Sequence, residues 1–129
     1  MPVCNALDGF DVAAAVDRML GQFSLWRQAL ALFVEHFANW AEAWQGAQCD
    51  PVAERKKVHA LRSAAANVGA VRLSAAAGAL EDALAALIRG ETVTALTDLR
   101  QELAVEFANG WQVAAKAVRL SPDDGEKMV

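Results

Sequence analysis

Residues 49–69 read CDPVAERKKVHALRSAAANVG, and this stretch holds one complete helix with its own start and stop signals. Asp50 is suited to accept hydrogen bonds from the first turn, and Pro51 is suited to that turn because it has no amide proton to leave unpaired. Gly69 can take the left-handed conformation that ends a helix. The stretch therefore predicts a helix from Pro51 to about Val68.

The rest of the chain also reads as helices. Good helix formers dominate it, alternating β-branched runs are missing, and Gly or Pro falls only where one helix can end and another begin. A short helix is expected over about Val12 to Leu20, with Asp11 as its N-cap and Gly21 closing it. Longer helices are expected from Ser24 to about Gln45, along the segment marked by Leu73 to Leu87 and closed by Gly90, and along the segment marked by Leu96 to Val118.

The long helix from Ser24 carries one wide apolar stripe. Its members step by fours and threes, which places them on one face of a helix. They are Trp26, Leu30, Phe33, Phe37, Trp40 and Trp44. A stripe of this kind is typical of core packing, and we expect these side chains in the core rather than around a cofactor.

Long amphipathic helices joined by connections of a few residues are typical of antiparallel bundles. We therefore expect an all-α fold: an up-down-up-down four-helix bundle with a short additional N-terminal helix. The chain is about one domain long. We expect a single domain over residues 1–129, with the bundle at about 8–119 and a polar tail at 120–129. The apolar stripes can all be buried within one bundle, so a monomer is expected.

Composition narrows the class of protein. Of the 129 residues, 55% are hydrophobic and 22% charged, and the net charge is −4, which is typical of a globular protein and gives no basic character suited to nucleic acid. The N-terminus lacks a secretory signal, and no apolar run approaches membrane-spanning length. We expect a cytoplasmic protein without a membrane partner. Cys4 and Cys49 form neither a disulfide framework nor a CxxC pair.

A histidine stands on the polar side of the 51–68 helix. At about 100° per residue, Arg55, Lys56, Arg62, Ser63 and Ala66 fall close to His59, whereas Leu61, Ala64 and Val68 fall on the far side. His59 is therefore expected to face solvent. Lys57 falls on the core side, so either the first turns project beyond the bundle or its stem runs along apolar surface.

An exposed imidazole near neutral pH offers a free nitrogen nucleophile. A phosphoryl group on that nitrogen would bring roughly two negative charges, which Arg62 and Arg55 are within reach to offset. The small residues Ser63 and Ala66 keep the approach open. The face has no carboxylate cluster and no glycine-rich phosphate loop, so a partner must supply the phosphoryl group and any metal.

Each feature also has a plainer interpretation. An exposed histidine among basic residues is most often ordinary solvated surface, and the run ERKK at 54–57 taken alone is an ordinary solvated charge run. His36 flanks the apolar stripe and is expected to be a partly buried packing residue. A metal or haem site built from His36 and His59 is disfavoured, because no helix carries the spaced carboxylate and histidine pairs of such sites.

The segment HALRSAAANVGAVRL at 59–73 resembles the signature of histidine-containing phosphotransfer (HPt) domains. In that signature a histidine is followed by an apolar residue, a basic residue, small residues, a glycine and a further apolar position. Here these are His59, Leu61, Arg62, Ser63, the alanines, Gly69 and Leu73. The segments GFDVAAAVDRMLG and LWRQALALFVEHF are more loosely similar to the first two helices of the family, and the likeness extends to about Val118.

The resemblance implies that His59 accepts the phosphoryl group, that Arg62 is its charge partner, and that Ser63 leaves room for the docking protein. The family most often has lysine at the position of Arg62 and glycine at the position of Ser63. Arginine keeps the positive charge of lysine and adds a planar fork of hydrogen-bond donors. The implied protein is a phosphoryl carrier rather than an enzyme, with no ATP site and no cofactor of its own.

The partners implied are response-regulator receiver domains, which would supply Mg²⁺, and a hybrid sensor histidine kinase. Arg55 and Lys56, with Ser63 and Ala66, would form the docking surface, because a local basic excess complements an acidic receiver pocket. The alternative is a helical module that docks on a receiver or kinase without transferring phosphate.

Overall fold

The computed structural model describes residues 7–119, and all regular structure within that range is helical. The helices, in chain order, are α1 (Val12–Arg18), α2 (Phe23–His36), α3 (Trp40–Ala47), α4 (Pro51–Val68), α5 (Val71–Ile88) and α6 (Leu96–Arg119). The predicted all-α class is confirmed. The predicted polar tail at 120–129 and Cys4 lie outside the described residues.

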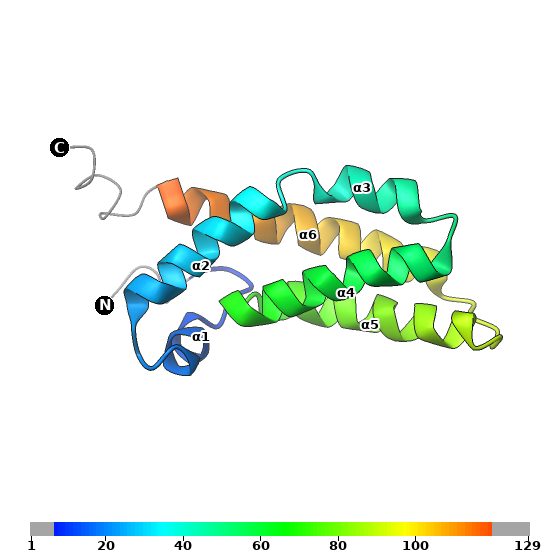
Figure 1. The fold of residues 1–129 in the computed structure, drawn as a ribbon, viewed down its shortest axis with the longest axis horizontal. Helices are drawn as coiled ribbons and strands as arrows, with labels where there is room; N and C mark the ends of the chain where they lie inside the picture. The colour runs from blue at the N-terminus through cyan, green and yellow to red at the C-terminus, as the bar shows by residue number, and fades with distance from the viewer. Residues whose placement is uncertain (1–6, 120–129) are drawn as a thin grey trace.

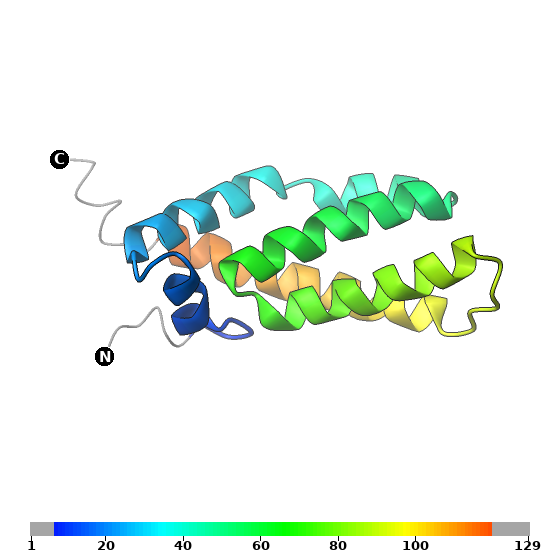
Figure 2. The ribbon, with the colours of Figure 1, turned by 60° about the horizontal axis from the view of Figure 1, so that its bottom comes forward.

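The helices lie lengthwise beside one another in an elongated molecule (Figure 1). The most extensive packing is between α4 and α5, followed by that between α5 and α6; α2 packs on α6 and α4, and α3 on α4. The turn between α4 and α5 lies at the end of the molecule where α1 sits, and the connection between α5 and α6 lies at the opposite end (Figure 2). No helix in residues 7–119 is long and apolar enough to cross a membrane.

The ends of α4 follow the sequence prediction. Asp50 Oδ1 accepts hydrogen bonds from the backbone N–H of Val52 at 3.1 Å and of Ala53 at 3.4 Å, and Pro51 opens the helix. Gly69 closes it with φ +85°, and a Cβ added there would lie 2.7 Å from the carbonyl oxygen of Asp11. Glycine is therefore required both for the left-handed turn and for the close approach of the loop before α1.

The short first helix differs slightly at its end. The Asp11 side chain accepts from the backbone N–H of Ala14 at 3.1 Å, as expected of an N-cap. The helix stops at Arg18 rather than Leu20. Leu20 and Gly21 both adopt positive φ angles, +60° and +73°, so the left-handed turn begins one residue earlier than the glycine.

The prediction of one continuous helix from Ser24 to Gln45 is wrong. The helix breaks at Phe37–Asn39, and α3 begins anew at Trp40. All six members of the predicted stripe are nevertheless buried. The break allows the α3 indoles to reach α4, because Trp40 Nε1 donates to the Lys57 carbonyl oxygen at 3.1 Å and Trp44 Nε1 donates to a Glu54 carboxylate oxygen at 3.0 Å.

The position of α3 settles the question raised by Lys57. The first turns of α4 do not project beyond the other helices, because α3 packs alongside them through Trp40. The Lys57 side chain is half-buried. The long apolar stem of lysine allows such a position while the ammonium group reaches water.

Glu54 corrects the interpretation of the run ERKK as solvated surface, since its side chain is fully buried. Arg100 of α6 binds it through two hydrogen bonds, Nη2 to Oε1 at 2.6 Å and Nε to Oε2 at 3.0 Å, and Trp44 donates the third. Arg100 also donates to the carbonyl oxygen of Gln48 at 3.2 Å. The pair therefore joins α3, α4 and α6 at one end of the molecule.

Arg100→Ala is expected to destabilise the protein by about 3–5 kcal/mol, because it leaves the buried Glu54 carboxylate without its cation. Urea unfolding followed by helical circular dichroism measures the loss. Arg89→Ala is the matched control: it removes the exposed pair with Glu91 and should leave the unfolding midpoint nearly unchanged. Equal effects of the two substitutions would show that the buried pair contributes no more to stability than an exposed pair does.

Candidate functional site

His59 lies midway along α4 and faces solvent, with 63% of its side chain exposed. Leu61 and Val68 on the opposite side are buried, so the orientation predicted from the helical periodicity is correct. The other predicted site residues on this helix are all exposed: Arg55, Lys56, Arg62, Ser63 and Ala66. The local sequence produces this arrangement because the helix has only one face apolar enough to be buried.

A carboxylate from α5 meets this face. Glu81 Oε2 lies 2.8 Å from His59 Nδ1, and Glu81 Oε1 accepts from Arg62 Nη1 at 3.1 Å. Arg55 Nη2 lies 3.7 Å from the same carboxylate. Glu81 itself is only 5% exposed. One buried carboxylate therefore joins three of the predicted site residues.

The electrostatics of Glu81 favour its charged form. Burial by itself raises the pKa of this carboxyl, but the hydrogen bonds from Arg62 and His59 and their positive charges lower the pKa on balance. A charged carboxylate only accepts hydrogen bonds, so this contact favours the neutral tautomer of His59 with its proton on Nδ1. The free electron pair of the ring is then on Nε2.

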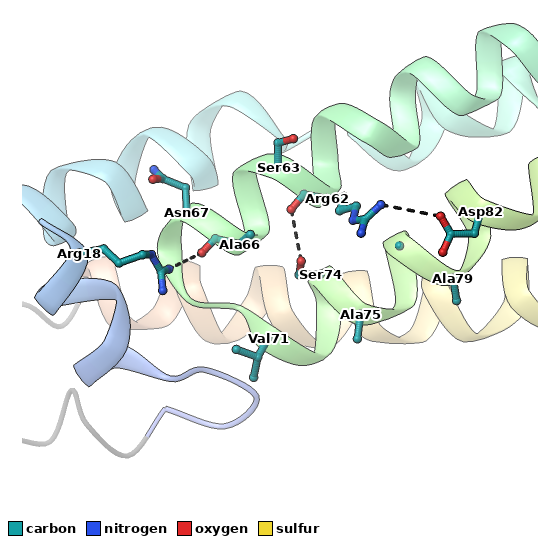
Figure 3. A pocket seen from close by; sticks show the side chains of 11 residues that line it. Arg18, Arg62, Ser63, Ala66, Asn67, Val71, Ser74, Ala75, Ala79 and Asp82 are labelled. Carbon is teal, nitrogen blue, oxygen red and sulfur yellow. Dashed lines mark hydrogen bonds and ion pairs between the residues drawn. The ribbon is translucent and has the colours of Figure 1, made fainter. Parts of the chain in front are cut away.

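Arg62 lies against the backbone of α5. A Cβ added at Gly78 would lie 3.1 Å from Arg62 Nε and 3.3 Å from its guanidinium carbon. The guanidinium also approaches Asp82 Oδ1 at 4.0 Å, as Figure 3 shows. The missing side chain at Gly78 is therefore what allows Arg62 to lie flat across α5 towards Glu81.

Ser63 and Ala66 line a shallow groove between α4 and α5, with Arg62 towards one end and Arg18 at the other (Figure 3). Arg18 Nη2 donates to the carbonyl oxygen of Ala66 at 2.6 Å. Arg55, Lys56 and His59 line a second, separate hollow. The predicted residues thus border two hollows on either side of the imidazole, and neither hollow contains a bulky side chain from this helix other than the cations and His59.

Sequence reasoning missed Glu81, because it lies on another helix and the histidine face was treated as having no carboxylate. The available signal was its position. Glu81 follows Leu80 and stands one helical turn after Ala77, on the side of α5 that is otherwise apolar. A carboxylate at such a position needs a cation partner, and His59 and Arg62 meet that need.

His36 corrects a second expectation, since it is exposed rather than partly buried. It is the last residue of α2, and its ring meets that of Phe37 in an edge-on arrangement with 5.0 Å between the ring centroids. His36 and His59 do not converge on a metal site: within residues 7–119 no three His, Cys, Asp or Glu side chains are placed to hold an ion.

Comparison of the chain with models of known protein families, with curated proteins and with solved structures gave no significant match. An exposed imidazole whose Nδ1 faces a carboxylate can act as a nucleophile or general base at Nε2. Arg62 and Arg55 beside it are suited to an anionic group on that nitrogen.

Gly78→Ala tests the placement of Arg62. Alanine in a helix interior is favoured over glycine by about 1 kcal/mol, so the substitution alone is expected to stabilise α5. The new Cβ crowds Arg62, and the gain in the wild-type background is expected to be smaller than the gain in an Arg62→Ala background. Urea unfolding of the two single variants and the double variant measures this coupling.

An equal gain from Gly78→Ala in both backgrounds would contradict the close contact between Arg62 and α5. Gly46→Ala is the control, because a Cβ there would meet no atom within 4 Å. Its effect on unfolding should not depend on whether residue 62 is arginine or alanine.

Proposed function

We propose that this protein is a histidine phosphotransfer protein of a two-component phosphorelay. His59 accepts a phosphoryl group from an aspartate of a receiver domain and passes it to an aspartate of another receiver. The observation that carries the proposal is the exposed imidazole whose Nδ1 is held 2.8 Å from a buried carboxylate. Its Nε2 makes no hydrogen bond to residues 7–119 and is open to a docking partner.

The helix arrangement supports this interpretation. We interpret α2 and α3 together as one broken helix of an up-down-up-down four-helix bundle, with α4, α5 and α6 as the other three and α1 as the additional N-terminal helix. This is the architecture that the resemblance to HPt domains implies. In such a domain the histidine projects from the middle of a bundle helix, where a partner can close over it.

Transfer needs little chemistry from the carrier itself. The Nε2 electron pair attacks phosphorus in line with the departing aspartate oxygen; the N–P bond forms as the P–O bond breaks, and the electron pair of that bond leaves with the carboxylate. Positioning and charge stabilisation dominate reactions of this kind. The receiver would supply Mg²⁺, which explains why the carrier needs no metal site of its own.

Arg62 can offset the phosphoryl charge without leaving Glu81. Its Nη1 is the atom bound to Glu81, and a guanidinium has further N–H donors on its other nitrogens. The side chain is 44% exposed, so these donors are accessible to a group on His59. Arg55 and Lys56 add positive charge on the other side of the ring, which favours encounter with an acidic receiver pocket.

The partners proposed are receiver domains and a hybrid sensor histidine kinase, met in the cytoplasm by a monomeric carrier. The small side chains of Ser63 and Ala66 leave room beside His59 for the receiver. Serine stands where the resemblance would most often place glycine. Its exposed hydroxyl adds little bulk at the edge of the groove.

Incubation with a phosphorylated receiver is expected to label the wild-type chain with phosphate that is labile to acid and stable to alkali. His59→Gln should abolish the label with the helical circular dichroism intact. His36→Gln is the matched control, since it removes the other exposed histidine, and it should retain the label. Label that survives in His59→Gln and disappears in His36→Gln would overturn the assignment. Tight receiver binding without any label would favour the non-transferring docking module.

Arg62 is tested separately. Arg62→Lys keeps the positive charge and should transfer at a rate close to that of the wild type. Arg62→Ala removes charge-assisted hydrogen bonds to the phosphoryl group and is expected to slow transfer about tenfold or more. Rapid-quench measurement of labelled protein gives both rates. Equal rates for the alanine and lysine variants would show that residue 62 does not act through its charge.

A further inference from the structure

Two adjacent carboxylates on α5 have very different surroundings. Asp82 has 80% of its side chain exposed, whereas Glu81 has 6% exposed and is the one that meets the imidazole. Burying a charged group is costly unless cations and hydrogen bonds offset the cost. A neutral glutamine has a single side-chain oxygen, so it could not place an acceptor against both His59 and Arg62. Glu81 places one oxygen against each of them and brings a negative charge to the ring.

The surrounding charges indicate the role of that negative charge. From α4, Arg55 and Lys56 line a hollow together with His59, and Arg55 and Arg62 approach the same Glu81 carboxylate as the ring does. From α5 come Glu81 and Asp82, and within residues 7–119 the ion pair that Asp82 makes is the one with Arg62, at 4.0 Å. Within residues 7–119 no ion pair reaches Glu81 or His59 from α2, α3 or α6. Glu81 is therefore the nearest negative charge to the ring.

We propose that Glu81 is a positioning residue that keeps the Nδ1 proton on His59 throughout phosphotransfer, so that the ring always leaves phosphorus as neutral imidazole. This inference rests on the proposed function and assigns a charge requirement to the same site. The basic surface that would attract a receiver also repels the positive charge of a phosphorylated ring. The Glu81 carboxylate offsets this repulsion at Nδ1, the atom that carries the proton.

The proton balance shows why the charge matters. When Nε2 forms its bond to phosphorus, the ring becomes cationic if Nδ1 keeps its proton. In the onward step the N–P bond breaks and its electron pair returns to Nε2, while a receiver aspartate oxygen bonds to phosphorus. With the Nδ1 proton in place the leaving group is neutral imidazole. Without it the leaving group is an imidazolate anion, which is far more basic and leaves more slowly.

The test compares wild type, Glu81→Gln and Glu81→Asp, each loaded chemically with phosphoramidate so that no partner is needed for loading. The ³¹P signal of each loaded protein is followed against pH, and onward transfer to a receiver is timed over the same range. Asp82→Asn is the matched control, since it removes one carboxylate from the neighbouring position on the same helix.

Glu81→Gln is expected to move the ³¹P titration, and the pH above which transfer slows, to lower pH by about one unit. Above that pH, transfer should be about tenfold slower than in the wild type. Glu81→Asp should restore most of the difference, because it keeps the charge, and Asp82→Asn should leave both profiles nearly in place. Identical profiles for Glu81→Gln and wild type would overturn the proposal.

The ¹⁵N spectrum of the unloaded wild-type protein gives an independent readout, which does not depend on loading or on the stability of a variant. It should show the proton of the neutral His59 ring on Nδ1; a proton on Nε2 would overturn the proposal. If the spectra and titrations behave as expected but no receiver takes part in transfer, the carrier function fails while the assignment of Glu81 stands. If transfer occurs with no dependence on Glu81, the reverse holds.

Discussion

The close approach of α4 to α5 is the constraint on which the rest of the molecule depends. The buried positions of α5 include Ala76, Ala77 and Gly78, and those of α4 include Ala65, so little bulk separates the two helices. The Arg62 carbonyl oxygen accepts a hydrogen bond from Ser74 Oγ at 3.4 Å, which reflects the same proximity. These small residues bring the α5 backbone within reach of side chains on the exposed face of α4.

That proximity places the Glu81 carboxylate against Nδ1 of His59. A wider separation would leave the carboxylate in contact with α5 alone and His59 as an ordinary surface residue. Gly69 holds the same two helices together at one end, since its left-handed turn lets α5 begin at Val71, directly after α4. The buried Ala65 and Gly69 thus help to set the spacing of the two helices, whereas the exposed Ala66 lines the groove between them.

Features that depend on a single helix could be predicted from the sequence. The caps of α4, the outward direction of His59 and the buried stripe from Trp26 to Trp44 all follow from local chemistry and periodicity. The break before Trp40 could not be predicted in this way. No proline or glycine marks it, and its benefit lies in the indole hydrogen bonds to α4, which depend on a tertiary contact.

The same limit applies to the candidate site. His59, Arg62 and Arg55 were identified from one helix because they share a face of it. Glu81 was missed because periodicity treats each helix alone and does not say which position of α5 meets which position of α4. Glu54 was missed for a related reason: a charge run gives no indication that one of its members points inwards to Arg100 of a distant helix.

The two buried glutamates differ in how far their partners are exposed to solvent. Glu54 is fully buried and is bound by an arginine with only 25% of its side chain exposed, together with a buried indole, so every partner is committed to the fold. Glu81 is bound by partners that are 44% to 63% exposed, and one of them is an imidazole. A pair that served stability alone would gain more from sheltered partners, since solvent weakens exposed ion pairs. The arrangement at Glu81 instead holds a buried charge against the Nδ1 of an exposed ring, and in the proposed phosphotransfer this contact would leave Nε2 as the nucleophile.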